Sequence, residues 1–400
     1  MPAPSTFDIK RVIRPNILKL EPYRCARDDY SEGILLDANE NSFGPVHQAR
    51  ITQDAAGAAS IAGQADHQQL HRYPDPMGRR VKQRVLQLRP SVPSVDNVFL
   101  GVGSDEVIDL LVRITCQPGR DSILVTPPTY GMYKVVASIN DVGVVKVPLV
   151  VEGERTFQLD VDAVIERAVG DETIKLVWLC SPGNPTGTRL DEADVRRVLE
   201  SGYRGLVVID EAYVDFMKPS RGESFAKLVG EYPNVFVMQT MSKSFGLAGI
   251  RMGIGMGSAE LVQYLNNTKA PYSLSTLALD VAHDALSADG VSKMRQVAAS
   301  LCAQRDEFLI PQLQALPHVG EIVGGNDANF VLCRFVDENG CASNGIAKRL
   351  YTEMAENRGL VVRYRGGDHG CEGCLRITVG TPDENRVVIA TMRVLLDAEA

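Results

Sequence analysis

Three apolar runs near the middle of the chain each end in a cluster of polar residues. LVWLC is followed by SPGNPTG (181–187), LVVI by DEAY (210–213), and VFVMQ by TMSKSFGLAGIR (240–251). Ligands of open parallel α/β sheets bind at the carboxyl ends of the strands. We therefore expect the three clusters to meet in one crevice and to form a site there.

Lys243 and Asp210 are the residues of these clusters with the clearest chemistry. Lys243 lies between Ser242 and Ser244, where loss of water would lower its pKa and make its amine a nucleophile toward an aldehyde. An ordinary exposed loop lysine is the alternative. Asp210 ends an apolar strand and needs a partner, which could be a protonated ring nitrogen, a helix N-terminus or a metal ion. Arg251, in a short Gly/Ala segment, suits a phosphate.

Asn184 and a short glycine segment extend this site. The Asn184 amide can donate to a ring oxygen, although SPGNPTG also has the composition of a plain tight turn. GVGS (101–104) precedes a helical pattern, so its backbone amides could cradle a phosphate if Arg251 offsets the charges of Asp105 and Glu106. The segment does not match GxGxxG, which argues against a nicotinamide dehydrogenase. A nucleophilic lysine, a buried aspartate, a ring-facing asparagine and a phosphate site together indicate pyridoxal 5'-phosphate.

At these residues the chain resembles the fold type I aminotransferases and, within them, the histidinol-phosphate aminotransferase family. The motifs that carry the resemblance are EPY (21–23), LDANEN (36–41), RYPDP (72–76), PPTYGMY (127–133), SPGNPTG (181–187), DEAYVDF (210–216), SKSFGLAGIRMG (242–253) and CLRITVGT (374–381). The resemblance implies an α/β fold, with a large domain around a mainly parallel sheet and a smaller α/β domain built from both chain ends. It also implies amino-group transfer between L-histidinol phosphate and 2-oxoglutarate, giving imidazole-acetol phosphate and L-glutamate in histidine biosynthesis.

The resemblance assigns roles around the cofactor residue by residue. Lys243 would form the Schiff base with pyridoxal 5'-phosphate and shuttle the proton, and Asp210 would pair with the pyridinium nitrogen. Tyr130 would stack on the ring. Asn184 and Tyr213 would hydrogen-bond to the phenolic oxygen. The residues expected around the cofactor phosphate are Ser104, Asp105, Ser242 and Arg251.

The resemblance also implies a substrate subsite and a homodimer with shared active sites. Tyr73 would reach the phosphate of the neighbouring subunit's cofactor. Arg376 would bind the anionic end of the substrate, with Arg363 and Tyr23 beside it. The alternative for Arg363 is a plain ion pair with a surface acid such as Asp368. Two other enzymes of the same fold remain as alternatives, an aromatic amino acid aminotransferase and a phosphothreonine-type decarboxylase. A regulatory protein that senses the cofactor is the alternative that is not an enzyme.

Composition excludes several other classes of protein. The chain has 400 residues, of which 42 are basic and 50 acidic, so its net charge of -8 argues against a nucleic-acid partner. No apolar run approaches the length of a membrane span and no signal-peptide core follows the start, so we predict a cytoplasmic protein. Eight scattered cysteines indicate reduced thiols. His369, Cys371 and Cys374 have ligand-like spacing, but without a second pair they predict no metal site.

The elements that must position these residues follow an α/β pattern from about residue 97 to 257. The strands predicted there are 97–100, 122–125, 143–147, 174–179, 206–209 and 235–238. Beyond residue 258, the predicted helices are 259–266, 277–288 and 292–316, and the predicted strands are 329–334, 360–363 and 375–379. We predict an N-terminal segment over 1–72 that belongs to the small domain, a large cofactor domain over 73–275 and a C-terminal small domain over 276–400. Residues 47–69, rich in Ala, Gln and Gly, predict a mobile surface insertion.

Overall fold

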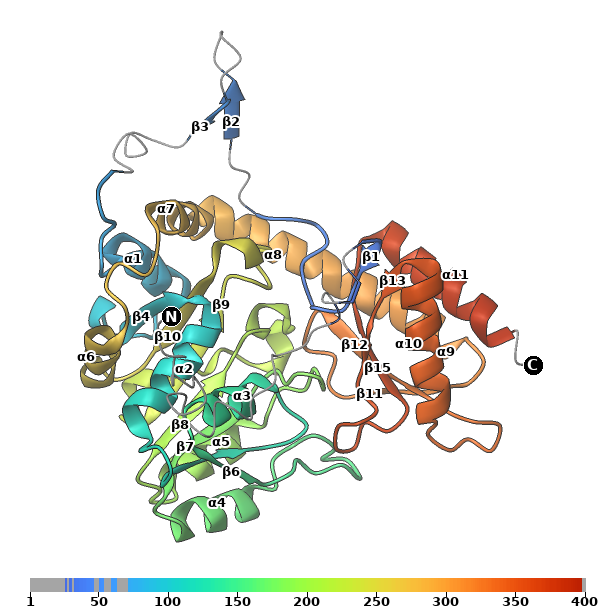
Figure 1. The fold of residues 1–400 in the computed structure, drawn as a ribbon, viewed down its shortest axis with the longest axis horizontal. Helices are drawn as coiled ribbons and strands as arrows, with labels where there is room; N and C mark the ends of the chain where they lie inside the picture. The colour runs from blue at the N-terminus through green and yellow to red at the C-terminus, as the bar shows by residue number, and fades with distance from the viewer. Residues whose placement is uncertain are drawn as a thin grey trace, which may run out of the picture.

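A seven-stranded sheet forms the centre of the larger part of the molecule (Figure 1). The structure, a computed structural model, describes residues 26, 29–30, 32–46, 50–53, 59–62 and 71–397. In the order β4-β10-β9-β8-β7-β5-β6, the strands are β4 (Val98–Val102), β10 (Met252–Met256), β9 (Val235–Thr240), β8 (Leu206–Asp210), β7 (Ile174–Cys180), β5 (Ser122–Val125) and β6 (Gly143–Lys146). The six strands predicted in this region are confirmed to within two residues at either end.

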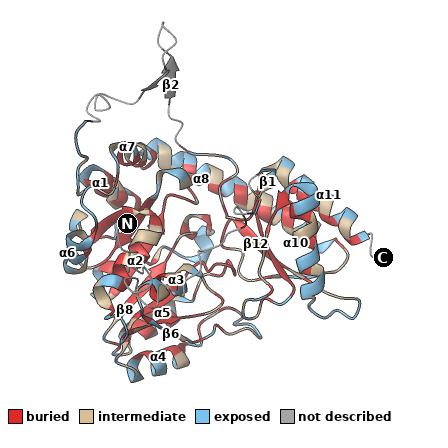
Figure 2. Ribbon diagram, viewed as in Figure 1, coloured by how far each residue is buried: buried red, intermediate tan, exposed pale blue. Residues whose placement is uncertain are grey.

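The central strands of this sheet are mostly apolar because both faces are covered. Val177 and Leu179 of β7 belong to the core on one face, whereas Leu176 and Trp178 belong to the core on the other. Side chains alternate between faces along a strand, so a strand between two helical layers must be apolar at every position. Figure 2 shows the buried residues concentrated in this sheet and the inner sides of its helices.

The seventh strand, β10, was not predicted from the sequence. It runs antiparallel to both β4 and β9. Its sequence, MGIGM, has little of the β-branched composition that indicates a strand. The glycines are required by packing, because a Cβ on Gly253 would lie 2.3 Å from the Gly103 oxygen, and one on Gly255 would lie 2.3 Å from the Phe236 ring.

Helices cover the large sheet of the molecule. They are α1 (Arg79–Leu88), α2 (Gly103–Thr115), α3 (Met132–Ile139), α4 (Val161–Gly170), α5 (Glu192–Glu200), α6 (Ala259–Thr268) and α7 (Thr276–Ala285). Asp160 and Asp191 accept hydrogen bonds from the first turns of α4 and α5, which satisfies amides that have no partner within the helix. Val107 and Leu111 recur at helical spacing on α2, and both are fully buried.

The smaller part of the molecule contains an antiparallel sheet and receives both ends of the described chain. Its strands, in the order β11-β12-β15-β14, are β11 (Val319–Val323), β12 (Phe330–Phe335), β15 (Cys374–Thr378) and β14 (Arg363–Tyr364). Helices α10 (Asn344–Arg358) and α11 (Pro382–Asp397) belong to this part, and β1 (Ile34–Leu35) pairs in parallel with β13 (Leu360–Val361). The predicted architecture is thus confirmed, whereas β11 was missed because it is a half-exposed edge strand with a register shift.

A long helical segment connects the two parts (Figure 1). It comprises α8 (Ala288–Ala303), a π-helical stretch (Gln304–Leu309) and α9 (Ile310–Gln314). Met294 belongs to the core of the large sheet, and Leu301 belongs to the core of the small one. The predicted domain boundary at 275/276 stays a prediction; since α7 packs into the larger core, we propose that the boundary lies within α8.

The predicted insertion contains regular structure. The backbones of β2 (Arg50–Gln53) and β3 (Ala59–Ala62) pair antiparallel and project from the rest of the molecule (Figure 1). The surface insertion predicted over 47–69 stays a prediction, and its two strands were not predicted because short polar and alanine-rich strands give no clear alternation of hydrophobicity. Within the described part of the chain, no helix is long and apolar enough to cross a membrane.

Candidate active site

A cavity of about 480 Å³ opens where β7, β8 and β9 end. Of the predicted site residues that the structure describes, all except Tyr73 line it: Ser104, Asp105, Tyr130, Asn184, Asp210, Tyr213, Ser242, Lys243, Arg251, Arg363 and Arg376. The predicted convergence of three strand ends therefore occurs. Residues that the sequence reasoning did not select also line the cavity, among them Asp37, Asn39, Glu40, Thr240 and Arg365.

Lys243 lies three residues beyond the end of β9, with its amine in the cavity. Its Nζ donates to the backbone oxygen of Ala38 at 2.7 Å. Burial and, to a smaller extent, the nearby Arg376 cation lower the pKa of Lys243 to about 8, while Glu40 and Asp105 act in the opposite direction. With this pKa, a substantial fraction of the amine is unprotonated near pH 8 and can act as a nucleophile.

Asp210, the last residue of β8, is buried at the base of the cavity. Its Oδ2 accepts from the Tyr133 hydroxyl at 2.6 Å, and its Oδ1 accepts from the backbone nitrogen of Ala212 at 3.1 Å. Tyr133 is itself held by stacking on Trp178, with ring centroids 4.6 Å apart. Burial raises the pKa of Asp210 to about 6 despite these two donors. A cationic group in the cavity would stabilise its ionised form, which is the partner expected from the sequence.

Asn184 and Arg376 form a buried contact at one side of the cavity. The Arg376 Nη1 donates to Asn184 Oδ1 at 2.6 Å, and its Nη2 donates to the backbone oxygen of Asp37. Because Oδ1 of Asn184 already accepts from Arg376, the amide Nδ2 is the atom that can serve a ligand. Burial lowers the pKa of Arg376 to about 10, and the Arg365 and Arg363 cations contribute to this decrease. An anion bound beside these arginines would relieve that repulsion.

Tyr213 is positioned as a donor toward the cavity. Its hydroxyl accepts from Asn39 Nδ2 at 2.9 Å. Burial raises the pKa of Tyr213 to about 12, so the hydroxyl keeps its proton at neutral pH. Asn39 is held in turn by Thr378, whose hydroxyl donates to Asn39 Oδ1 at 3.1 Å.

The N-terminus of α2 supplies the expected anion site. Ser104 and Asp105 lie in its first turn, and the Arg251 Nη2 contacts Asp105 Oδ2 at 3.2 Å. The Glu106 carboxylate turns away and accepts from the Val102 nitrogen at 2.6 Å. Asp105 and Glu106, whose charges were expected to repel an anion, are thus paired with Arg251 and with the Val102 nitrogen. The positive end of α2 is therefore available to a phosphate.

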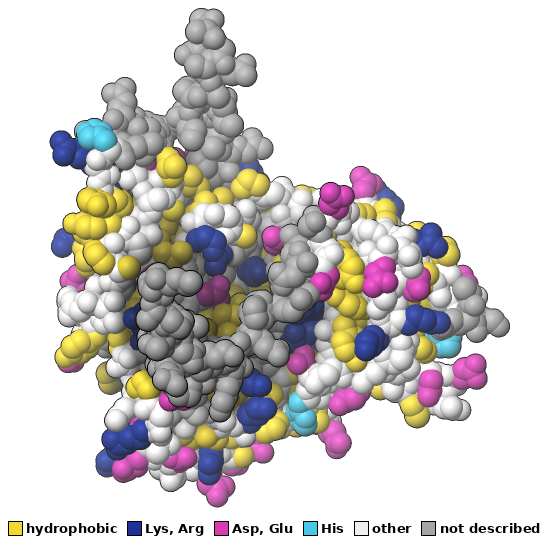
Figure 3. Space-filling view, in the orientation of Figure 1, with side chains coloured by type: hydrophobic (Ala, Val, Ile, Leu, Met, Phe, Trp, Pro, Cys, Tyr) yellow, Lys and Arg dark blue, Asp and Glu magenta, His cyan; other side chains and the backbone are white. Residues whose placement is uncertain are grey.

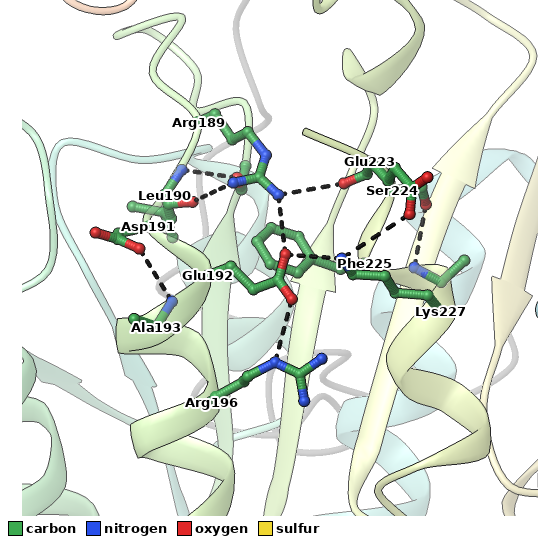
Figure 4. A network of polar contacts seen from close by, with 12 residues as sticks. Arg189, Leu190, Asp191, Glu192, Ala193, Arg196, Glu223, Ser224, Phe225 and Lys227 are labelled. Carbon is green, nitrogen blue, oxygen red and sulfur yellow. Dashed lines mark hydrogen bonds and ion pairs between the residues drawn. The ribbon is translucent and has the colours of Figure 1, made fainter. Parts of the chain in front are cut away.

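A network of charged residues anchors the segment that follows Asn184 (Figure 4). The Arg189 Nη2 lies 3.5 Å from Glu192, which also pairs with Arg196 at 3.1 Å and with Lys227 at 2.9 Å. Arg189 further lies over the Phe225 ring at 4.8 Å. These contacts hold the connection between β7 and α5 against the neighbouring segment, so the chain that follows the Asn184 turn is fixed.

A second network, which the sequence reasoning missed, supports the Lys243 segment. Ser244 donates to Asp215 Oδ2 at 2.7 Å, and Asp215 pairs with Arg89 at 2.6 Å. The side chains of the pair are 13% and 14% exposed, so the charges are shielded from water. Asn41 Nδ2 also donates to the Ser244 oxygen at 3.2 Å. The residue next to Lys243 is therefore held by buried contacts on two sides.

Two predicted site residues, Tyr23 and Tyr73, stand apart from this group. Tyr23 lies outside the described residues. Tyr73 is 82% exposed and stacks on Tyr272, with ring centroids 4.6 Å apart. Among the described residues, no group of three or more His, Cys, Asp and Glu side chains is arranged to hold a metal ion.

Comparison of the sequence with known families and proteins identifies one family. Residues 31–392 match the model of the family described as aminotransferase class I and II. The histidinol-phosphate aminotransferase of Candida maltosa is 46% identical over 402 residues, which covers 98% of this chain and 99% of that protein. The enzyme of the same name from Saccharomyces cerevisiae is 46% identical over 395 residues, covering 96% of each.

Solved structures show the same fold. A histidinol-phosphate aminotransferase from Sinorhizobium meliloti, in complex with pyridoxal-5'-phosphate, superposes with a TM-score of 0.79 at 20% identity and covers 97% of this chain and 98% of that one. An L-threonine-O-3-phosphate decarboxylase from Porphyromonas gingivalis gives a TM-score of 0.65 at 19% identity and covers 83% and 93%. At these identities the similarity establishes the fold and not the reaction.

Proposed function

The chain belongs to the aminotransferase class I and II family, and we propose that it transfers an amino group between L-histidinol phosphate and 2-oxoglutarate. The products are imidazole-acetol phosphate and L-glutamate, in the histidine pathway. The observation that carries this proposal is one cavity that holds both the Lys243–Asp210 pair and the arginines 363 and 376. The first pair suits an aldehyde cofactor with a protonated ring nitrogen, and the arginines suit an anionic substrate end.

The cavity fits pyridoxal 5'-phosphate, the cofactor of this family. Asp210 is a buried carboxylate whose pKa is raised, so it needs a cation facing it. The α2 N-terminus and Arg251 would hold the phosphate, while Asn184 and Tyr213 would donate to the phenolic oxygen. When bound, the cofactor supplies an electron sink that stabilises negative charge on the substrate carbon.

The residues of the chain perform the proton transfers and the orientation. Lys243 Nζ, with a pKa of about 8, can both accept and return a proton near neutral pH. The Arg376 guanidinium is held by Asn184 and Asp37, so it presents a fixed surface to an anionic group. The substrate is thereby oriented before any proton moves, which lowers the entropic part of the barrier.

Substrate preference distinguishes the proposed reaction from the reactions of other enzymes with the same fold. Assays of the purified protein with histidinol phosphate, phenylalanine and phosphothreonine test it directly. We expect amino transfer from histidinol phosphate at the highest kcat/KM. Preference for phenylalanine would favour an aromatic aminotransferase, and loss of carbon dioxide from phosphothreonine would favour a decarboxylase.

We expect Arg363→Gln to impair the phosphate substrate more than glutamate. Histidinol phosphate has no α-carboxylate, so the arginines must hold a phosphate ester, and Arg363 lies opposite Arg376 in the β14–β15 register. Loss of one charge-assisted pair should cost about 1.5 to 3 kcal/mol, or on the order of tenfold to a hundredfold in kcat/KM for histidinol phosphate. Single-turnover half-reactions with each amino donor measure the two effects separately. Equal losses in both half-reactions, or none, would contradict the role given to Arg363.

We also propose a homodimer in which Tyr73 serves the neighbouring active site. Hydrophobic side chains gather over the region of α6 and α7 (Figure 3), where Tyr264, Tyr272 and Leu277 are 55%, 44% and 39% exposed. Exposed apolar patches of this kind mark interaction surfaces, and Tyr73 stacks on Tyr272 at this surface. The cytoplasmic location predicted from the sequence stays a prediction.

Tyr73→Phe should weaken retention of the cofactor without changing its own subunit's cavity. Mixing Tyr73→Phe subunits with Lys243→Ala subunits should restore activity, because one of the two sites in a mixed dimer then has both residues. Sedimentation velocity and activity titration of the mixture measure this. A monomer under assay conditions, or mixtures with no activity above the sum of the two variants, would refute the shared site.

A further inference from the structure

A third arginine lies at the substrate end of the cavity beside an acid of its own. Arg365 and Asp368 both line the cavity wall. The Arg365 Nε lies 2.7 Å from Asp368 Oδ2, and the two side chains are 17% and 37% exposed. Neither was selected as a site residue from the sequence, where Asp368 entered only as an alternative partner for Arg363.

The small sheet brings this arginine to the other two. Arg363 pairs in register with Arg376 across β14 and β15, and the Arg365 nitrogen donates to the Cys374 oxygen at 2.9 Å, which continues the same pairing. Alternate residues of an extended segment point to the same face, so Arg363 and Arg365 share a face beside Arg376. Three guanidinium groups are thus held close together, and their mutual repulsion favours the binding of an anion beside them.

Hydrogen bonds fix the connection after Arg365, so the Arg365–Asp368 pair belongs to an ordered part of the cavity wall. The Asp368 nitrogen donates to the Arg365 oxygen at 2.9 Å. Farther along, the Arg334 Nη2 donates to the Gly370 oxygen at 2.8 Å, and the Gly373 nitrogen donates to Asn344 Oδ1 at 2.7 Å. The wall can therefore hold a charged pair in place without a ligand.

Two substrates of different charge must use this wall in turn. The phosphate ester of histidinol phosphate carries up to two negative charges, whereas a carboxylate of glutamate carries one. Coulomb attraction scales with the charge on the anion. A phosphate dianion can therefore compete with the single charge of Asp368 for Arg365, and a carboxylate competes less well.

We propose that Arg365 is a specificity-determining residue for the phosphate substrate, and that Asp368 holds it when the carboxylate substrate is bound. This inference rests on the proposed function and deepens it, because it adds an ion pair on the cavity wall to the discrimination that Arg363 provides. Arg376 serves both anions, Arg363 favours the phosphate, and Arg365 turns from Asp368 to the phosphate.

The test uses the holoenzyme and two variants with opposite expected signs. Arg365→Gln should raise the half-saturating concentration of histidinol phosphate in single turnovers by about tenfold, while that for glutamate changes less than about twofold. The inhibition constant of inorganic phosphate against glutamate should rise in parallel. Asp368→Asn frees Arg365 and should lower both the histidinol phosphate and the inorganic phosphate constants. A merely structural pair would weaken binding in both variants, so the opposite signs are diagnostic.

Arg386→Gln is the matched control, since it also removes an arginine that pairs with an aspartate three positions away in the sequence, but on α11 and away from the cavity lining. It should leave the ratio of the two substrate constants unchanged. If wild-type protein accepts histidinol phosphate but Arg365→Gln changes both constants equally or not at all, the inference is overturned and the proposed function stands. If wild-type protein does not accept histidinol phosphate, the proposed function fails and the inference fails with it. Should Arg365→Gln not fold, the sign of the Asp368→Asn effect decides alone.

Discussion

Replacing Lys243 by alanine should reduce turnover of histidinol phosphate with 2-oxoglutarate at least about a thousandfold. In the proposed mechanism the amine would both bind the cofactor aldehyde and carry the substrate proton, so its loss would remove two functions at once. The cofactor should still bind, because Asp210, Arg251 and the α2 N-terminus remain. Steady-state rates, together with cofactor content after dialysis, measure the two expectations independently.

Lys82 provides a matched control for this prediction. Burial also lowers the pKa of Lys82 to about 8, but it belongs to α1 and does not line the cavity. Borohydride reduction of the loaded protein, followed by peptide mass spectrometry, should therefore attach the cofactor at Lys243 and not at Lys82. Attachment of added cofactor should become faster as pH rises through about 8, since the neutral amine is the reactive form. Wild-type turnover in Lys243→Ala, or labelling at Lys82, would contradict the mechanism.

Replacing Asp210 by asparagine should cost on the order of a hundredfold or more in kcat. Asparagine has nearly the same shape but cannot hold a protonated ring nitrogen, so negative charge on the substrate carbon is less stabilised. Cofactor content should fall much less than the rate. Rates measured at saturating cofactor separate the two.

Tyr133→Phe gives a graded comparison at the same carboxylate. It removes the 2.6 Å hydrogen bond but keeps the charge of Asp210, so the rate should fall by about tenfold at most. Losing this donor should also raise the pKa of Asp210 further, which would make the deficit larger at low pH. An Asp210→Asn variant as active as Tyr133→Phe would show that the charge of Asp210 does not act in the reaction.

The part of this site that could be predicted from the sequence lies at the ends of buried parallel strands. Continuous apolar runs such as LVVI indicate strands that are covered on both faces. The topology of a parallel sheet then places the polar residue that ends each run at the ligand-binding edge. Asp210 is the clearest case. Lys243 and Asn184 follow from the same rule applied to β9 and β7.

The part that could not be predicted depends on contacts between distant residues. Arg365 reaches the cavity only because β14 pairs with β15 beside Arg376, and nothing in the sequence distinguishes it from an exposed arginine. Asp215 supports Lys243 through Ser244 and Arg89, which is a residue 126 positions away. Strand β10 could not be predicted because its glycines are required for close packing and have low strand propensity. Such features follow from tertiary structure and not from local pattern.

A single-turnover experiment tests the central claim most directly. Protein loaded with pyridoxal 5'-phosphate is mixed with histidinol phosphate in the absence of 2-oxoglutarate, and the cofactor and the substrate product are quantified by mass spectrometry. The account predicts that one amino group per subunit moves to the cofactor, with an equal amount of imidazole-acetol phosphate formed, and that 2-oxoglutarate then restores the aldehyde. Cofactor that is unchanged by histidinol phosphate but aminated by phenylalanine would contradict the account.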